Sequence, residues 1–225
     1  DEDLKRRDFT INAMAYNQSK KLVDLFSGEE DLNNKLIRCV GSPDERFSED
    51  ALRMLRAVRF ACVLNFDIEK NTFEAIQHNA SRIEHISKER IQAELNKILM
   101  SSKPSRGIRL LLDSKLLDYI LPEISRLSGF DQHNPFHHLE LLEHTLCVLD
   151  KVEPKLQLRL AALFHDAGKI DTVTLDENGI GHFYGHDSVS EEIAKSVLKR
   201  LRYSNEIIEL TSQLVRYHMI QANVI

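Results

Sequence analysis

The sequence predicts a mainly α-helical protein with a small β-hairpin region near its N-terminus. Two features of the composition favour helices: the 225 residues include only 8 Gly and 5 Pro, and 29% of them are charged. The third observation is a long helical periodicity in the middle of the chain, uninterrupted by Gly or Pro. With 42% hydrophobic residues, a chain of this length can bury a sizeable core and suggests one or two domains.

The N-terminal region predicts the few strands. Two short apolar stretches, residues 11–16 and 21–25, are separated by polar residues and predict a hairpin. Residues 28–35 predict a turn with a short helix, and residues 36–40 predict another short strand before a Gly-Ser-Pro turn. We expect no strand beyond this point.

Residues 47–60 predict a single helix, with Ser48 as its N-cap and acidic residues in the first turn. At about 100° per residue, one face is apolar and is assigned to the core. This face consists of Ala51, Leu52, Met54, Leu55, Val58 and Cys62.

The opposite face of this helix is charged in an unusual order. Asp50 and Arg53 stand three residues apart, and a carboxylate beside a guanidinium can match the edge of a nucleobase. Arg56 and Arg59 continue the row and would suit phosphate oxygens. The alternative is an ordinary solvated face, with an ion pair worth a few tenths of a kcal/mol.

Residues 67–120 predict helices throughout, with Asp67 and Ser87 as caps, and residues 129–135 predict a linker. Behind Ser87 the periodicity places one apolar face in the core. It consists of Ile91, Leu95, Ile98 and Leu99. The other face, expected to be solvated, carries Lys88, Glu89, Arg90 and Glu94.

Net charge and cysteine usage restrict the function classes. The net charge of -5 argues against non-specific nucleic-acid binding by the whole surface, so RNA or nucleotides must be bound by local basic clusters. The three cysteines form no Cys-x-x-Cys pair, which indicates neither a zinc knuckle nor a disulfide framework. They are typical of a reducing compartment, and we expect a cytoplasmic protein. No apolar run approaches the roughly 18 residues of a spanning helix, so no membrane partner is expected.

Histidines concentrate in the second half of the chain. Eight of the ten lie beyond residue 130: His133, His137, His138, His144, His165, His182, His186 and His218. His165 and Asp166 end an apolar helical stretch, and with His144 from another helix they could supply three metal ligands. The alternative is a set of hydrogen-bonded core histidines.

Ordered motifs in the first half point to a known family. They are Arg-Arg-Asp-Phe-Thr-Ile-Asn-Ala-Met-Ala from residue 6, Gly28 with Asp31 and Leu32, Ile-Arg-Cys-Val-Gly from residue 37, Arg-Phe-Ser-Glu-Asp-Ala-Leu-Arg from residue 46 and Ile-Ser-Lys-Glu-Arg-Ile from residue 86. In this order and spacing they resemble the class II tRNA nucleotidyltransferases, that is, the CCA-adding enzymes and the related bacterial poly(A) polymerases.

This resemblance implies protein-templated addition of C and A to the tRNA 3′ end from CTP and ATP. It implies that Arg7 lies at the incoming nucleotide, that Asp50 and Arg53 read the base, and that Arg56 and Arg59 follow them. The tRNA 3′ end, CTP and ATP are the expected partners, and a homodimer is left open. The family's Asp-x-Asp pair for Mg²⁺ should lie upstream of residue 1, so we expect this chain alone to transfer no nucleotide.

The second half carries His-Asp-x-Gly-Lys from residue 165, which resembles the HD-domain metal-dependent phosphohydrolases. This resemblance implies one metal held by His144, His165 and Asp166, and a second by His186 and His218. The metal would be a divalent transition metal (Mn, Ni, Co, Fe or Zn). Lys169 would stabilise phosphate charge as a catalytic residue. The family's late aspartate has no counterpart after Asp187.

Three domains are therefore expected. Residues 1–46 form the end of a nucleotidyltransferase head domain, residues 47–128 a helical nucleotide- and RNA-binding domain, and residues 129–225 an all-helical HD domain truncated at its C-terminus. Two alternative functions stay open at this point. One is an HD-type phosphohydrolase acting on nucleotides or cyclic phosphates, and the other is a non-catalytic tRNA-docking module.

Overall fold

The computed structural model describes residues 2–19, 21–133 and 139–220. His137 and His138, two members of the predicted histidine cluster, lie outside the described residues. The chain divides into two compact units. Unit 1 comprises residues 1–98 and 106–120, and unit 2 comprises residues 99–105 and 121–225.

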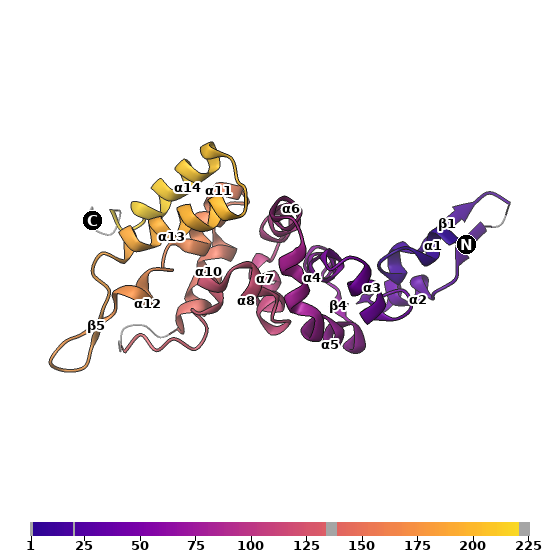
Figure 1. Cartoon of the computed structure of the whole chain (residues 1–225), viewed down its shortest axis with the longest axis horizontal. Coiled ribbons are helices and arrows are strands. Elements are labelled where there is room, and N and C mark those ends of the chain that lie inside the picture. The colour runs from indigo at the N-terminus through magenta and orange to yellow at the C-terminus, as the bar shows by residue number, and fades with distance from the viewer. Residues whose placement is uncertain (1, 20, 134–138, 221–225) are drawn as a thin grey trace. The chain divides into compact units, whose positions relative to one another are not determined.

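Unit 1 is mainly helical, with short strands in its N-terminal part (Figure 1). Its elements in chain order are α1 (Glu2–Lys5), η1 (Thr10–Asn12), β1 (Met14–Asn17), β2 (Lys21–Asp24), α2 (Gly28–Asn33), β3 (Leu36–Ile37), α3 (Pro43–Glu49), α4 (Leu52–Leu64), β4 (Asp67–Ile68), α5 (Lys70–Asn79), η2 (Ala80–His85), α6 (Lys88–Leu99), α7 (Pro104–Asp113) and α8 (Leu116–Ile120).

The strands confirm the predicted hairpin and add one that the sequence did not reveal. β1 and β2 pair antiparallel, with Met14 opposite Asp24 and Asn17 opposite Lys21. β3 pairs in parallel with β4, which lies in a stretch predicted to be entirely helical. A strand of two residues is too short to show the alternation of apolar and polar residues that predicts a strand. β4 is therefore defined only by its pairing with β3.

The single helix predicted over residues 47–60 is wrong. The chain forms α3 and α4, and Ser48 lies inside α3 rather than at an N-cap. Asp50 lies between the two helices in an extended conformation, and its Oδ1 accepts a hydrogen bond from the Leu52 N–H at 3.1 Å. The carboxylate thus satisfies a backbone donor at the start of α4, which is what a capping side chain does.

The predicted core faces of α4 and α6 are confirmed, although one predicted cap is wrong. The apolar residues assigned to these faces, from Ala51 to Cys62 and from Ile91 to Leu99, are all buried. Asp67 belongs to β4, and α5 is instead capped by Glu69, whose Oε2 accepts a hydrogen bond from the Thr72 N–H at 2.8 Å. Ser87 directly precedes α6.

In its described residues, unit 2 consists of helices and one short hairpin, β5–β6, which the sequence analysis did not predict. Its elements are α9 (Pro122–Ser125), α10 (Leu141–Lys151), α11 (Leu156–Phe164), α12 (Lys169–Thr172), β5 (Thr174–Leu175), β6 (Gly181–His182), α13 (His186–Arg200) and α14 (Asn205–Arg216). The mainly helical fold class is confirmed for both units.

Helix α11 forms the centre of unit 2. It packs against α10, α13 and α14 (Figure 1), and Leu160, Leu163 and Phe164 are almost completely buried. A helix that is apolar nearly all round is expected in such a position. Its C-terminal end therefore carries the next residues, His165 and Asp166, into the interior.

Gly168 allows α13 to pack closely beside this end. A Cβ atom at residue 168 would lie 2.7 Å from the His186 carbonyl oxygen and 2.7 Å from the Ser190 nitrogen. The Gly168 N–H donates a hydrogen bond to the Ser190 hydroxyl at 2.9 Å. This close approach places the first turn of α13, which begins with His186, next to Asp166.

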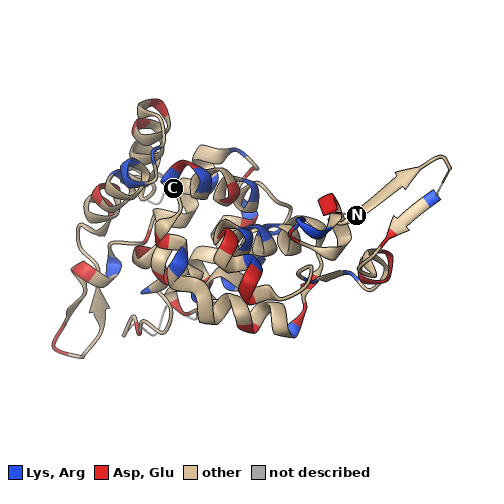
Figure 2. Cartoon of the chain, turned by 45° about the vertical axis from the view of Figure 1, so that its right-hand side comes forward, with Lys and Arg blue, Asp and Glu red and all other residues tan. Residues whose placement is uncertain are grey.

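Charged residues of both signs are mixed along the helices (Figure 2). This distribution agrees with the expectation that binding sites for anionic ligands depend on local clusters. Within the part of the chain that the structure describes, no helix has both the length and the apolar character needed to cross a membrane.

Candidate functional site

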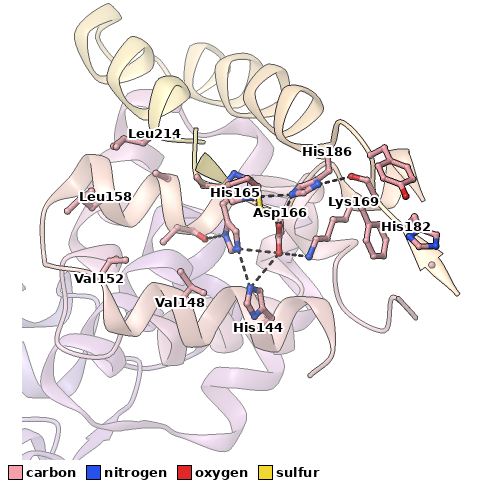
Figure 3. A pocket seen from close by; sticks show the side chains of 17 residues that line it. His144, Val148, Val152, Leu158, His165, Asp166, Lys169, His182, His186 and Leu214 are labelled. Carbon is pink, nitrogen blue, oxygen red and sulfur yellow. Dashed lines mark hydrogen bonds and ion pairs between the residues drawn. The ribbon is translucent and has the colours of Figure 1, made fainter. Parts of the chain in front are cut away.

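Asp166 is the centre of a cluster in unit 2 that contains all five predicted metal ligands. Its Oδ2 lies 3.2 Å from His165 Nε2 and 3.6 Å from His144 Nε2. Its Oδ1 lies 3.4 Å from His186 Nε2 and 3.8 Å from His218 Nε2. Figure 3 shows His144, His165 and His186 around Asp166. Two groups of three ligands result, and Asp166 belongs to both.

Four helices bring these side chains together. His144 lies in α10, His165 and Asp166 follow α11, His186 begins α13, and His218 follows α14. Asp166 is only 2% exposed, whereas the His144 side chain is 42% exposed. The cluster is thus a buried carboxylate reached from solvent on the His144 side.

Backbone carbonyls fix the orientation of three of the imidazole rings. A carbonyl oxygen can only accept, so each Nδ1 must donate its proton to it. These hydrogen bonds are 2.7–2.9 Å long and join His165 to Ala162, His186 to Phe183, and His218 to Val215. In a neutral ring held in this way the Nε2 lone pair faces Asp166, which is the form required of a metal ligand; in a protonated ring Nε2 donates to the Asp166 carboxylate instead.

Contacts between ring nitrogens show that the cluster fits a cation. His165 Nε2 lies 3.3 Å from His144 Nε2, and His186 Nε2 lies 3.3 Å from His218 Nε2. Two lone pairs at this separation repel each other unless a proton or a metal ion lies with them. Imidazole nitrogens with a carboxylate suit Zn, Mn, Fe, Co or Ni, so the residues fit the divalent metal that the HD resemblance implies.

The electrostatics of the cluster agree with this fit. Burial alone would raise the pKa of Asp166, but hydrogen bonds with His165 and His186 outweigh it and hold the pKa well below its usual value. Burial also favours neutral histidines and lowers the pKa of His218. At His186 the bonds to Asp166 and to the Phe183 carbonyl, together with the Asp166 charge, outweigh burial and raise the pKa. Asp166 is therefore a permanent anion, as a shared metal ligand should be.

Lys169 completes the cluster. Its Nζ lies 2.9 Å from Asp166 Oδ2 and 5.3 Å from the ring centroid of Phe183, and the residue is 7% exposed. Its ammonium group is held beside the carboxylate, where it can neutralise an incoming phosphate oxygen.

A cavity of about 830 Å³ opens around the cluster. One side is apolar and includes Val148, Val152 and Leu158, and the other carries Lys169 and His182 (Figure 3). Phe183 and Tyr184 also line the cavity. The site thus combines a charged centre with two chemically different walls, which is typical of a ligand pocket.

A second candidate site is a polar cleft of about 250 Å³ in unit 1. Its lining residues are Arg6, Arg7, Asp8, Asn12, Asp50, Leu52, Arg53, Arg56 and Arg90. Four of the five predicted nucleotide-binding residues are among them. The fifth, Arg59, is not.

Asp50 and Arg53 are each held by other partners in this cleft. Arg90 Nη2 donates to Asp50 Oδ2 at 2.7 Å. Burial tends to raise the pKa of Asp50, but the bonds with Arg90 and the Leu52 N–H, together with the charges of Arg90 and Arg53, outweigh it, and the pKa lies below its ordinary value. The Arg53 guanidinium donates to Glu49 Oε2 at 2.5 Å and to the Arg6 carbonyl oxygen at 3.2 Å.

Asp8 links the first motif to α4. Arg56 Nε donates to Asp8 Oδ2 at 2.5 Å, and Asn12 Nδ2 donates to Asp8 Oδ1 at 2.7 Å. Sequence reasoning did not assign Asp8, Asn12 or Arg90 to the site. Asp8 and Asn12 share a motif with Arg7 and could have been found there, whereas nothing local marks Arg90, which meets Asp50 from 40 residues away.

Arg59 lies against α6 instead of lining the cleft. Its Nε is 2.7 Å from Glu94 Oε2, although the N–H is not aligned for a hydrogen bond, and its guanidinium lies 3.8 Å from the ring centroid of Phe60. Glu94 is only 4% exposed. The prediction that Glu94 belongs to a solvated face is therefore wrong, because this carboxylate forms an ion pair between α4 and α6.

The fold and the Asp166 cluster define a class, a helical protein with an HD-type cluster of histidines and an aspartate that could hold a metal ion, and comparison with known proteins extends it. Residues 137–224 match the HD domain family. Residues 1–38 match the poly A polymerase head domain, and residues 65–127 match the probable RNA and SrmB-binding site of polymerase A.

Relatives with known activities match almost the whole chain. The A-adding tRNA nucleotidyltransferase of Deinococcus radiodurans is 36% identical and covers 98% of this chain, which spans 53% of that protein. The CC-adding tRNA nucleotidyltransferase of Thermus thermophilus is 38% identical over 97% of this chain and 52% of its own length. The crystal structure of the Bacillus stearothermophilus CCA-adding enzyme in complex with CTP matches with a TM-score of 0.65 and 28% identity, over 98% of this chain and 47% of that one.

The chain belongs to the family of tRNA nucleotidyltransferases and related poly(A) polymerases, with a C-terminal HD domain. The resemblance read from the sequence motifs is thereby confirmed. The chain spans about half the length of the curated relatives that match it throughout.

Proposed function

We propose that the chain supplies the nucleotide-reading part of an enzyme that adds C and A to the tRNA 3′ end, using CTP and ATP. The observation that carries this proposal is the unit 1 cleft, where Arg7, Asp50, Arg53 and Arg56 lie together. The family relationship supports it, as does the 28% identity to a CCA-adding enzyme solved with CTP.

The cleft has the donors and acceptors that these two bases need. Cytosine and adenine share an exocyclic amino group, whose N–H can donate a hydrogen bond to a carboxylate. Uracil and guanine present a carbonyl at that place. Asp50, held by Arg90 and the Leu52 N–H, keeps lone pairs for this amino group. Arg53 would donate to a ring nitrogen or carbonyl, and Arg7 and Arg56 would bind phosphate oxygens.

Arg59 takes a different part in this proposal. Its contact with Glu94 holds α4 against α6, so it would keep the reading residues in place without touching the nucleotide.

Mg²⁺ would assist attack of the tRNA 3′ hydroxyl on the α-phosphate. Among the described residues, both groups of three that could hold a metal lie in unit 2. We propose that the Mg²⁺ ligands are carboxylates outside this chain, as the family motif implies. The chain itself would then bind nucleotide without transferring it.

Equilibrium binding of the four nucleoside triphosphates tests the reading role. CTP and ATP should bind more tightly than UTP and GTP, and Arg53→Ala should remove a preference worth about 1–3 kcal/mol, the discrimination of a bidentate contact. Lys70→Ala, at an exposed position of α5, should change nothing. Equal affinities for all four nucleotides, with or without Arg53, would refute the proposal.

The division into residues 1–46, 47–128 and 129–225 is proposed along with this function, supported by the positions of the three family matches. We also propose a cytoplasmic location, supported by three free cysteines. A homodimer would be tested by sedimentation equilibrium.

A second candidate function is metal-dependent phosphoester hydrolysis at the Asp166 cluster. Two ligand triads that share one carboxylate favour it. A bound divalent metal would acidify a water for attack on phosphorus. Asp166 and the four histidines would hold the metals, and Lys169 would stabilise the charge on the phosphate oxygens.

Phosphate release from adenosine 2′,3′-cyclic phosphate with Mn²⁺ or Ni²⁺ tests this activity. Asp166→Ala should abolish both metal binding, measured by calorimetry, and turnover. Glu209→Ala, an exposed acidic position on α14, should retain both. Turnover that persists in Asp166→Ala would exclude the cluster as the site.

A further inference from the structure

Three consecutive aromatic residues line the cavity on the side opposite its apolar wall. They are His182, Phe183 and Tyr184, at the end of β6 and in the loop that leads to α13. Neither of the proposed functions uses them so far. Their arrangement indicates what part of a ligand this wall would bind.

His182 and Tyr184 form a stack of two rings. Their centroids lie 5.5 Å apart and the ring planes differ by only 7°. Tyr184 is 79% exposed, more than any other large hydrophobic residue of the described chain. Because His182 covers one face of the tyrosine ring and so much of the side chain is exposed, the outer face is open to a further flat group.

The hairpin holds this stack in position. His182 Nε2 lies 3.1 Å from Asp176 Oδ2, and Asp176 Oδ1 accepts the N–H groups of Asn178 and Ile180, each at 2.9 Å. The carboxylate thus fixes both the turn and the imidazole. A ring that is already oriented loses less conformational entropy when a ligand stacks on it.

The same segment is connected to the charged centre. The Phe183 carbonyl oxygen accepts the Nδ1 proton of His186 at 2.8 Å, and the Phe183 ring lies 5.3 Å from the Lys169 ammonium group. In Figure 3, Lys169 lies between Asp166 and His182. A ligand on this side of the cavity would meet a carboxylate and histidine cluster, then an ammonium group, then a stacked aromatic pair.

We propose that the His182–Tyr184 stack is a base-binding platform of the cavity. The ligand is a nucleoside phosphate whose base stacks on Tyr184 while its phosphate lies beside Lys169 and the Asp166 cluster. This inference rests on the phosphoester chemistry proposed for that cluster. Stacking is tolerant of base identity, so the platform selects bases in general and purines for their larger area.

A single fluorescent reporter tests the platform. The chain contains no Trp, so Tyr184→Trp keeps an aromatic face and introduces a unique fluorophore at the platform. Titration with AMP and with adenosine 2′,3′-cyclic phosphate should quench it saturably, whereas inorganic phosphate and ribose 5-phosphate should not. Quenching that persists when Arg53→Ala is combined with Tyr184→Trp does not depend on the nucleotide contact proposed for unit 1.

Affinities of the substituted chains provide the second measurement. Tyr184→Ala should weaken AMP binding at the cavity by about 5- to 150-fold, the equivalent of about 1–3 kcal/mol for one stacked base, and leave ribose 5-phosphate binding unchanged. Tyr184→Phe should bind like the unsubstituted chain. Tyr16→Ala, which removes a tyrosine that is 70% exposed in unit 1, is the matched control and should have no effect.

The outcomes separate this inference from the hydrolysis on which it rests. Quenching without turnover supports the base-binding platform and refutes the proposed phosphohydrolase activity. Turnover without quenching, or equal losses for AMP and ribose 5-phosphate in Tyr184→Ala, overturns the platform. An oligoribonucleotide ending in adenosine distinguishes an RNA end from a free nucleotide, because tighter quenching by one of them identifies the source of the base.

Discussion

Substitution of Gly168 by alanine should weaken metal binding at the Asp166 cluster without changing any of the proposed ligands. The backbone at this residue is in the right-handed helical region, with φ −82 and ψ −7, so alanine is allowed there. The cost comes from space. The new Cβ would lie 2.7 Å from the His186 carbonyl oxygen and from the Ser190 nitrogen, where ordinary contacts begin at 3.4 Å.

Relief of this overlap requires α13 to withdraw by about 0.7 Å, the difference between those two distances. Overpacking of this kind costs about 1–3 kcal/mol of unfolding free energy. His186 lies in the first turn of α13 and would move with it, by more than the roughly 0.2 Å that a metal site tolerates. We expect metal affinity to fall by at least about 10-fold, as when a supporting contact of a ligand is lost.

Urea unfolding followed by circular dichroism, together with calorimetric titration of Mn²⁺ or Zn²⁺, measures both effects. The control is Gly179→Ala in the β5–β6 turn, where a Cβ would meet no atom but φ is +76. Backbone strain should cost that variant about 1–2 kcal/mol and leave metal affinity unchanged. Unaltered metal affinity in Gly168→Ala would refute the argument that close packing of α13 positions His186.

Three further predictions concern unit 1 and the thiols. Arg90→Ala should raise the pKa of Asp50, because the Arg90 bond opposes the effect of burial; NMR titration of the carboxyl carbon measures this pKa. Since the pKa is lowered in the folded state, the Asp50 carboxylate stabilises unit 1 at pH values above its ordinary pKa. This stabilisation is lost as the pH falls through the folded-state pKa. Lys88→Ala should leave that pKa unchanged, and a pKa insensitive to Arg90 would contradict the assignment. Glu94→Ala should lower the unfolding free energy by about 3 kcal/mol, since it leaves the Arg59 charge unpaired at a largely buried site. The control is Glu89→Ala, at an exposed position. An equal or smaller decrease in unfolding free energy for Glu94→Ala would count against the buried ion pair. Ellman's reagent should modify Cys147 alone in the folded chain, because Cys39 and Cys62 are buried and burial raises the pKa of the Cys39 thiol to about 12. Rapid labelling of two or three thiols would contradict this prediction and show that unit 1 opens readily.

Local periodicity accounts for what the sequence could predict. The buried face of α4 repeats every 3.6 residues, and the helix that carries His165 and Asp166 is a continuous apolar stretch; both signals need no knowledge of the rest of the chain. Among the metal-ligand candidates, His144, His165 and Asp166 were proposed from their positions on helices, whereas His186 and His218 were implied by the resemblance to HD domains. Their convergence on one carboxylate required the packing of four helices.

The features that were missed depend on partners far away in the sequence. Arg90 and Glu94 lie on the exposed-looking face of an amphipathic helix, and only contacts with Asp50 and Arg59 distinguish them from solvated charges. The β3–β4 pair is defined by register with a segment about 30 residues away. The helix is interrupted at Asp50 because its side chain competes with backbone carbonyls for the Leu52 N–H. Hydrophobic periodicity contains no information about this hydrogen bond, so the interruption could not be predicted from it.

The interruption at Asp50 also has a consequence for protein engineering. Alanine at position 50 has a higher helix propensity, by up to about 0.7 kcal/mol, and would favour the continuation of α3 into α4. Alanine would also lose the hydrogen bond to the Leu52 N–H and the ion pair with Arg90, and loss of a capping side chain costs about 1 kcal/mol. Optimising helix propensity alone would therefore destabilise unit 1 and remove the carboxylate proposed to read the base. At this position the local contacts and the proposed activity both favour aspartate, although helix propensity alone favours alanine.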